Sequence, residues 1–181
     1  FRNNGGSGIK IDSKGRISIS NTQADLNTQN GFELASISAI TLTNVSASGN
    51  GGSGILVDNS TASGTVTIVN NISGSQGEFN NNGGSGIDIT TRGLISITNV
   101  QANENVGSGI SLDTCVTDGS KCLGSGGINL TTLFYQLNTF DGNQVHGIYI
   151  TSGGVVNLQY VSASENNEAG IFVENPNIFR F

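Results

Sequence analysis

Residues 82–89 read NGGSGIDI, and the same frame stands at residues 4–11 as NGGSGIKI and at residues 50–57 as NGGSGILV. An asparagine opens each copy, and the glycine four residues later leads into alternating aliphatic and polar residues. The frame recurs seven times in looser form, and four of the six glycine-to-glycine steps are 23 residues long. This spacing predicts a stacked solenoid. The glycines are Gly8, Gly31, Gly54, Gly86, Gly109, Gly147 and Gly170, and the asparagines are Asn4, Asn27, Asn50, Asn82, Asn105, Asn143 and Asn166.

Two strands follow each glycine, because apolar residues alternate with polar ones at period 2. The first strand is expected to point inward with Ile9/Ile11, Phe32/Leu34, Ile55/Val57, Ile87/Ile89, Ile110/Leu112, Ile148/Ile150 and Ile171/Val173. The second is expected to point inward with Ile17/Ile19, Ile40/Leu42, Val66/Ile68, Ile95/Ile97, Ile128/Leu130, Val156/Leu158 and Phe179/Phe181.

A third, shorter side completes each coil and ends in a small-residue slot seven positions before the next glycine. Phe79 and Phe140 take that slot in the two coils that carry insertions, where a wider coil would leave a void around a smaller side chain. The third side is expected to hold Thr22, Val45, Ile72, Val100, Leu133 and Val161, and the slot Phe1, Ala24, Ala47, Phe79, Ala102, Phe140 and Ala163.

Stacked asparagines are expected to hold the corners. Asparagine tolerates left-handed backbone, and amides about 4.8 Å apart in successive coils bond to one another. The seven asparagines of the repeat therefore predict one full ladder. A partial second ladder is expected at Asn21, Asn44, Asn70 and Asn99, with Thr132 and Tyr160 in the later coils.

The pattern Asn-x-x-x-Gly-Ile-x-Ile, then Ile-x-Ile-x-Asn, then Val-x-Ala-x-x-Asn resembles the coil of right-handed parallel β-helices of the pectin-lyase-like superfamily. The near-exact repeats are most similar to arrays in large bacterial surface and secreted proteins, often adhesin-like. The resemblance implies an all-β solenoid of about seven coils, two of them expanded, as a single domain over residues 1–181. Function stays open, because the superfamily contains lyases, hydrolases, epimerases, tailspikes and non-catalytic surface proteins.

Insertions in a solenoid leave its wall as loops. The coil from Gly54 to Gly86 gains nine residues and the coil from Gly109 to Gly147 gains fifteen. We expect the loops at Asn59 to Gly64, which contains Thr61, and Thr114 to Gly124 to project from one corner and to form a recognition surface. The alternative is that they are neutral decorations. The remaining extra residues are assigned to Ser73 to Glu78 and to Phe134 to Thr139.

Cys115 and Cys122 lie inside the larger loop, which predicts a disulfide and an extracellular or cell-surface location. Two free thiols, or half of a zinc site with His146, are the alternatives. Asp113 and Asp118 beside Lys121 are a candidate weak Ca²⁺ site. No other metal and no cofactor is expected.

Acidic residues occupy alternate coils of one column at Asp12, Asp58, Asp113 and Glu174. Acids two coils apart are about 9.6 Å from each other, too far to share one Ca²⁺ and at the limit for an inverting glycosidase pair. No catalytic residue is therefore predicted. Asp88 and Arg92 are read as a surface ion pair.

Tyr149 and Phe172 fall in the same outward column of successive coils. Their rings are expected either to present faces on which sugars stack or to form an ordinary cross-strand pair. His146 is expected to cap a turn.

The second strand exposes rows of small polar residues that resemble ice-binding solenoids, a minor alternative function. These rows are Ser18/Ser20, Thr41/Thr43, Thr67/Val69, Ser96/Thr98 and Asn157/Gln159. Glycosylation sequons begin at Asn44, Asn59, Asn71 and Asn129, and Asn59 is expected to be the most accessible.

The net charge is −6 without a basic cluster, which argues against nucleic acid as a partner, and no apolar run is long enough to span a membrane. Apolar ends suggest a segment of a longer protein or chains stacked end to end. The sequence therefore favours a non-enzymatic, extracellular stalk or spacer that contacts protein or glycan through its loops. The alternatives are a polysaccharide-active enzyme or a carbohydrate-binding relative.

Overall fold

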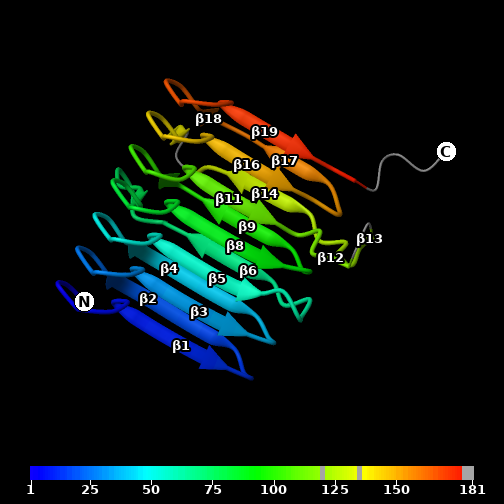
Figure 1. The fold of residues 1–181 in the computed structure, drawn as a ribbon, viewed down its shortest axis with the longest axis horizontal. Coiled ribbons are helices and arrows are strands. Elements are labelled where there is room, and N and C mark those ends of the chain that lie inside the picture. The colour runs from blue at the N-terminus through cyan, green and yellow to red at the C-terminus, as the bar shows by residue number, and fades with distance from the viewer. Residues whose placement is uncertain (119–120, 134–135, 177–181) are drawn as a thin grey trace.

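The computed structural model describes residues 1–118, 121–133 and 136–176, and every regular element within them is a β-strand. Successive coils stack from the N-terminal to the C-terminal end, so residues one repeat apart lie side by side (Figure 1). The expected inward pair Phe179/Phe181 and parts of two predicted loops, residues 119–120 and 134–135, lie outside the described residues.

Three parallel sheets form the sides of the coil. The first sheet contains β1 (Ile9–Ser13), β3 (Phe32–Ser36), β5 (Ile55–Asn59), β8 (Ile87–Thr91), β11 (Ile110–Asp113), β16 (Ile148–Thr151) and β19 (Ile171–Glu174). The second contains β2 (Ile17–Gln23), β4 (Ile40–Ser46), β6 (Val66–Val69), β9 (Ile95–Thr98), β14 (Ile128–Thr131) and β17 (Val156–Leu158). The third contains β7 (Gly77–Glu78), β10 (Val100–Gln101), β15 (Asn138–Thr139) and β18 (Val161–Ser162), and a separate antiparallel hairpin joins β12 (Thr117–Asp118) to β13 (Lys121–Cys122).

We call the turn from the first sheet to the second the first corner, the turn from the second to the third the second corner, and the turn that leads into the next coil the third corner. Strands pair in register across coils, as in the match of Ile55 with Ile87 and of Ile87 with Ile110. The predicted stacking of like positions is thereby confirmed, and with it the assignment of inward and outward residues in the first two sheets.

The core is a continuous tube of aliphatic side chains along the coils. Phe79 and Phe140 are fully buried, as are Ala24, Ala47 and Ala102 in the same slot of other coils. The prediction that phenylalanine fills this slot in the expanded coils is confirmed.

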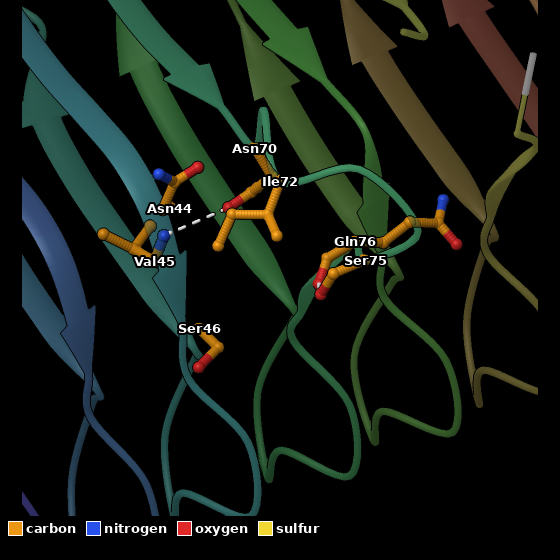
Figure 2. Close-up of a pocket in the computed structure, with 7 residues that line it drawn as sticks. All are labelled: Asn44, Val45, Ser46, Asn70, Ile72, Ser75 and Gln76. Atoms are coloured by element: carbon orange, nitrogen blue, oxygen red, sulfur yellow. Dashed lines mark hydrogen bonds between the residues drawn. The ribbon is translucent and has the colours of Figure 1, made fainter. Parts of the chain in front are cut away.

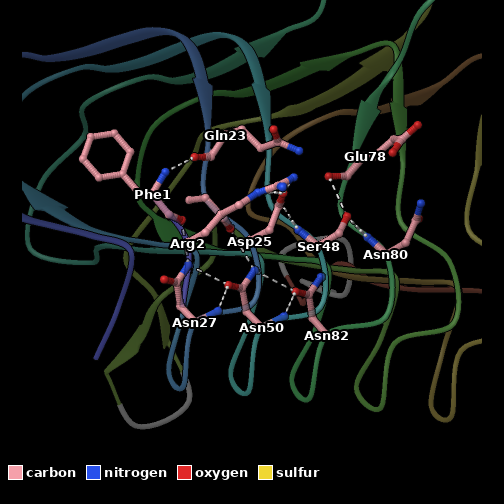
Figure 3. Close-up of polar contacts among 11 residues, drawn as sticks. Phe1, Arg2, Gln23, Asp25, Asn27, Ser48, Asn50, Glu78, Asn80 and Asn82 are labelled. Atoms are coloured by element: carbon pink, nitrogen blue, oxygen red, sulfur yellow. Dashed lines mark hydrogen bonds and ion pairs between the residues drawn. The ribbon is translucent and has the colours of Figure 1, made fainter. Parts of the chain in front are cut away.

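The asparagine ladder runs through the third corner from Asn4 to Asn166. Figure 3 shows its members Asn27, Asn50 and Asn82. Asn82 illustrates its bonds: its Oδ1 accepts from the backbone N and from Nδ2 of Asn50, and its own Nδ2 donates to the Ala47 carbonyl and to Asn105 Oδ1. The five inner members of the ladder are at most 2% exposed. Each therefore fixes the corner of one coil to the next.

The repeated glycine is required by close approach between coils. A Cβ atom at Gly109 would lie 2.6 Å from the Gly147 carbonyl oxygen and 2.7 Å from the Ala102 carbonyl oxygen. Real side chains do not fit at such distances, because both obstacles are backbone atoms.

A second ladder, which the sequence analysis missed, runs along the outer side of the third corner. Side-chain oxygens here accept the backbone N–H of the following coil: Asp25 from Ser48 at 3.0 Å, Asn80 from Asn103 at 2.8 Å and Asp141 from Ser164 at 2.7 Å. Arg2 pairs with Asp25 at its N-terminal end (Figure 3). The full outer row is Asp25, Ser48, Asn80, Asn103, Asp141 and Ser164.

Left-handed backbone marks the residue before each ladder asparagine in all seven coils. Leu26, Glu104 and Glu165 adopt it with φ of 55°, 57° and 56°. The other members are Asn3, Gly49, Asn81 and Gly142. At the second corner, Asn21, Asn44 and Asn99 adopt left-handed backbone as expected, and Tyr160 does so in a later coil.

The predicted third side is wrong in the two expanded coils. Ile72 and Leu133 are 52% and 39% exposed, because the second-corner insertions precede the third sheet and these residues lie within them. Gly77 and Asn138 take the wall position instead, in register with Val100 and Val161. The predicted bounds of these insertions, Ser73 to Glu78 and Phe134 to Thr139, therefore lie too late in the chain. Ile72 and Leu133 belong to the insertions, whereas Glu78 and Thr139 belong to strands of the wall.

Candidate functional site

The two first-corner insertions lie on the same corner, as predicted, and one intervening coil connects them. Arg92 of that coil donates its backbone N–H to the Ala62 carbonyl at 3.1 Å and accepts at its own carbonyl from Gly126 N at 3.2 Å. Thr91 Oγ1 adds a bond to the Gly64 carbonyl at 3.0 Å. The loops therefore form one continuous surface across three coils.

The larger insertion carries the β12–β13 hairpin, which is fastened at its base. Asp113 Oδ1 accepts the backbone N–H groups of Cys115 at 2.7 Å and Val116 at 3.1 Å. A disulfide joins Cys115 to Cys122, which confirms the predicted pairing. Asp118 and Lys121 face each other across the hairpin, and both are exposed. Their charged groups are thereby held above the corner on a constrained base.

The prediction that Asn59 is the most accessible sequon asparagine is wrong. Its side chain is 1% exposed, and Nδ2 donates to the carbonyls of Ser38 and Gly64 at 3.3 Å. Asn59 belongs to a buried first-corner column whose other members include Ser36, Thr91, Thr114 and Ser152. The candidate surface on this loop is instead formed by residues beyond Asn59, such as the exposed Thr61.

A shallow hollow of about 280 Å³ lies at the side of the smaller loop that faces the first coil. Asp12, Asp58 and Thr61 line it together with Lys14. Asp58 Oδ1 also accepts the backbone N–H of Ser60 at 3.1 Å, which fixes the start of the loop. The hollow offers charges of both signs and a hydroxyl group.

The acidic column has the predicted alternating register. Asp12 and Asp58 flank Ala35, and Thr90 separates Asp58 from Asp113. Residues 1–118, 121–133 and 136–176 contain no group of three or more His, Cys, Asp or Glu residues arranged to hold a metal ion. The weak Ca²⁺ site at Asp113 and Asp118 stays a prediction.

The predicted ion pair between Asp88 and Arg92 is wrong. Within the described part of the chain, the ion pairs between charged side chains are Arg2–Asp25 and Lys10–Glu33. Burial raises the pKa of Asp88, a hydrogen bond from Ser111 opposes that shift, and the charge of Asp113 adds to it. In contrast, hydrogen bonds from Lys10 and Ser7 lower the pKa of Glu33.

Tyr149 and Phe172 pair across β16 and β19 with ring centroids 5.5 Å apart and planes within 4°. His146 stacks on both at 5.4 Å. Its Nδ1 accepts the backbone N–H of Ala169 at 3.2 Å, so Nε2 carries the hydrogen that points to Glu168 at 3.1 Å. His146 therefore accepts a backbone N–H from the turn of the next coil, and Tyr149 and Phe172 lie as a cross-strand pair, while sugar stacking on their rings stays a prediction.

The second-corner insertions also meet. Gln76 Nε2 donates to the Leu137 carbonyl at 2.6 Å across the coil between them. A small cavity of about 130 Å³ lies beside the first of these insertions (Figure 2). Asn70 Oδ1 accepts there from Val45 N at 3.1 Å, while its buried Nδ2 has no partner among the residues that the structure describes. A Cβ atom at Gly77 would lie 2.2 Å from that Nδ2, so Asn70 fills space that a larger wall residue takes elsewhere.

The predicted binding residues therefore fall into two groups. Thr61, Asp113, Asp118 and Lys121 belong to the first corner, whereas the Tyr149–Phe172 pair belongs to the face of the first sheet near its C-terminal end. Arg92 lies between the two first-corner loops, whereas the sequence had suggested only an ion pair with Asp88. The sequence could have indicated this position only through the repeat, which puts Arg92 at the first corner of the coil between the two insertions.

Residues 1–77 match a family model described as a right handed beta helix region. The comparison with curated proteins gave no match, and neither did the comparison with solved structures. The coils after residue 77 continue the same three sheets in register. A search of the described residues for a helix long and apolar enough to cross a membrane found none.

Proposed function

Because the chain is a right-handed parallel β-helix, we propose that it is a secreted or surface-attached, non-enzymatic solenoid that acts as a spacer or adhesive stalk. The observation that carries this proposal is the meeting of two insertions on one corner of an otherwise regular coil. Loops on a rigid scaffold are where binding residues concentrate. The contact surface consists of the exposed residues of these loops, and its partner is a glycan or a protein.

The regular part of the molecule suits a spacer. The core passes without interruption through the coils, and two side-chain ladders join neighbouring coils at the third corner. Solenoid stability is a sum over such interfaces, so length is gained by adding coils without redesign of the core. This arrangement presents the loops at a fixed position on a stiff support.

An extracellular location follows from the Cys115–Cys122 disulfide as part of the proposal, since such bonds persist in oxidising compartments. Further coils, flanking domains or a second copy are proposed to pack at the last strand. Ile171 and Val173 of β19 are 44% and 45% exposed, whereas their counterparts Ile148 and Ile150 in β16 are fully buried. Light scattering over a range of concentrations tests self-stacking, and a persistent monomer would remove it.

The adhesive role is tested by shortening the loops. Residues 60–65 and 115–127 are each replaced by the three-residue link Ile-Ser-Ala, which connects β3 to β4 at residues 37–39. Binding to a glycan array and to immobilised extracellular matrix proteins is then compared with that of the unaltered chain. We expect binding to be lost in the shortened variant and kept in a control whose second-corner residues 71–76 are shortened. Equal binding by all three proteins would refute the proposal.

A polysaccharide-active enzyme is the second candidate, and its carboxylates would come from the outward acidic column. Asp58 and Asp113 lie in the same column on the first sheet with Thr90 between them. A screen of lyase and hydrolase activity on acidic polysaccharides, with Asp58, Asp113 and Asp118 replaced singly, decides between the two. Turnover that one substitution abolishes would establish the enzyme.

The second sheet supports ice binding as a minor candidate. Its two outward columns contain Ser, Thr, Asn, Gln and one Val in register, without a charged residue. Thermal hysteresis of a concentrated solution is the measurement. A Thr41→Lys substitution would abolish hysteresis that arises from this face, and its absence in the unaltered chain would remove the candidate.

A further inference from the structure

Both first-corner insertions hold Arg92 from either side. The smaller loop accepts its backbone N–H at the Ala62 carbonyl, and the larger loop donates to its carbonyl from Gly126. A Cβ atom at Gly124 would lie 3.0 Å from Arg92 Cα, which shows how closely the larger loop approaches. The side chain of Arg92 therefore starts from the centre of the proposed contact surface.

The Arg92 guanidinium has no partner among residues 1–118, 121–133 and 136–176. None of the ion pairs or side-chain hydrogen bonds there involves it, and its Nε is buried without an acceptor. A buried donor without a partner is unfavourable, so such groups are normally satisfied by protein, water or a ligand.

Unpaired basic side chains gather at this corner. Arg2 and Lys10 are paired with Asp25 and Glu33 elsewhere on the described surface. The remaining described basic residues all lie in first-corner connections or in the hairpin, and none of them forms an ion pair. They are Lys14, Arg16, Arg92 and Lys121.

The two acids paired in register with Thr90, two residues before Arg92, accept hydrogen bonds within the loops. Asp58 Oδ1 accepts from Ser60 N, and Asp113 Oδ1 accepts from Cys115 N and Val116 N. Neither carboxylate forms an ion pair with Arg92. Because Nε is shut off from water, the guanidinium charge is less screened than that of an exposed arginine, while its terminal nitrogens stay available as donors.

We propose that the first corner binds an oxoanion, a sulfate or carboxylate group, through the Arg92 guanidinium. This inference rests on the proposed function and deepens it, since it names the chemistry of the group that the loops contact. A planar fork of N–H donors matches such oxygens in pairs. Lys121 belongs to the hairpin one coil further on, where Asp118 faces it.

NMR of the full chain labelled with ¹⁵N-arginine tests the site. The buried Nε–H of Arg92 is expected to exchange slowly with water, and its signal is assigned by its disappearance in Arg92→Lys. Sodium sulfate, sodium acetate and sodium chloride are titrated at equal ionic strength. We expect a saturable shift of this signal with sulfate or acetate but not with chloride, and equal, non-saturating shifts of every arginine would overturn the proposal.

The variants separate a specific site from general attraction. Arg92→Gln is expected to weaken oxoanion binding by about tenfold or more, because charge-assisted hydrogen bonds are lost, and Arg92→Lys should weaken it as well. Arg16→Gln, on the same corner three coils away, removes the same charge and is the matched control. Equal weakening by Arg16→Gln and Arg92→Gln would overturn the proposal, and circular dichroism checks that each variant folds.

A sulfated disaccharide distinguishes the source of the group. Binding tighter than that of inorganic sulfate assigns the oxoanion to a glycan, whereas equal binding assigns it to the free ion, and both outcomes support the site. If no oxoanion shifts Arg92 while loop shortening still abolishes adhesion, this inference fails and the proposed function stands. If the Arg92 site binds while loop shortening leaves adhesion unchanged, the proposed function fails instead.

Discussion

The third corner has the same length in every coil, whereas the first corner varies widely. Six residues lie between the alanine or phenylalanine slot and the repeated glycine in all seven coils. At the first corner, three residues link Ser36 to Ile40, but thirteen link Thr114 to Ile128. One corner of the coil therefore excludes insertions and the other accepts them.

The hydrogen bonds explain this difference. Third-corner side chains bond to the matching position of the neighbouring coil, so an added residue would displace two partners at once. First-corner side chains mostly donate to whichever carbonyl lies below them, as Ser36 does to Gly15 and Thr91 does to Gly64. Such bonds survive when the chain leaves the wall and returns. The corner that stabilises the solenoid is therefore separate from the corner that is free to carry a binding surface.

The different roles of the first and third corners are tested most directly by placing the same insertion in each. A Gly-Ser-Gly segment placed after Asn103 at the third corner should lower the free energy of unfolding by about 3 to 5 kcal/mol, because both ladders are interrupted. The same segment after Ile37 should cost less than about 1 kcal/mol, the entropy of a slightly longer loop. Urea denaturation followed by circular dichroism gives both values. Equal destabilisation at the two sites would refute the separation of roles.

Two single substitutions test the same difference between the third and first corners. Asn82→Ala should cost about 2 to 4 kcal/mol, since it leaves the buried Asn50 N–H and the Ala47 carbonyl without partners. Asn59 is equally buried at the first corner, but its two bonds are 3.3 Å long and its Oδ1 has no partner in the described part of the chain. Asn59→Ala should therefore cost only about 1 to 2 kcal/mol. The difference between the two urea midpoints is the measurement, and a larger loss for Asn59→Ala would contradict the ranking.

The sequence alone predicted the features that repeat. Ile55, Ile87 and Ile110 stack because apolar residues recur at a fixed phase, and the ladder asparagines are visible because the same residue is needed in every coil. The outer ladder was missed because Asp, Ser and Asn all serve its single requirement, a side-chain oxygen. A column that requires only a side-chain oxygen, and not one residue type, gives a weaker repeat in the sequence.

The expanded coils were predicted less well, because length shows that a loop exists but not where it leaves the wall. Ile72 reads as a wall residue, yet Gly77 takes the position and Asn70 fills the space beside it. The candidate site was predicted in part for the same reason. The spacing indicated that the two loops share a corner, but only the folded loops reveal that Arg92 Nε, between them, has no acceptor among the described residues.

The left-handed residues that precede the ladder asparagines at the third corner allow two smaller tests, one that should stabilise the protein and one that should destabilise it. Glu104→Gly should stabilise the protein by about 0.5 to 1 kcal/mol, because a non-glycine residue at φ 57° is strained. Gly142→Ala, in the same column at φ 67°, should destabilise it by a similar amount through the same backbone strain. Steric overlap adds little, because the added Cβ would contact only Glu104 Cγ, at 3.6 Å. Thermal denaturation of the two variants checks the signs. Two shifts of the same sign would show that backbone strain does not govern this column.

The smallest expected effect is the pH dependence of stability that Asp88 causes, an acid that belongs to neither ladder. Asp25 and Asp141 at the third corner accept backbone N–H groups, whereas Asp88, on the first sheet, has a pKa raised chiefly by burial. A raised pKa means that the folded state binds the proton more tightly than the unfolded one, so stability falls as pH rises through the folded pKa. Asp88→Asn should therefore stabilise the protein at pH 7, and this gain should shrink as the pH falls towards 3.8, the ordinary pKa of the group. Melting temperatures of both proteins across this range provide the measurement, and a gain that grows towards acid pH would show that the fold stabilises the Asp88 carboxylate instead.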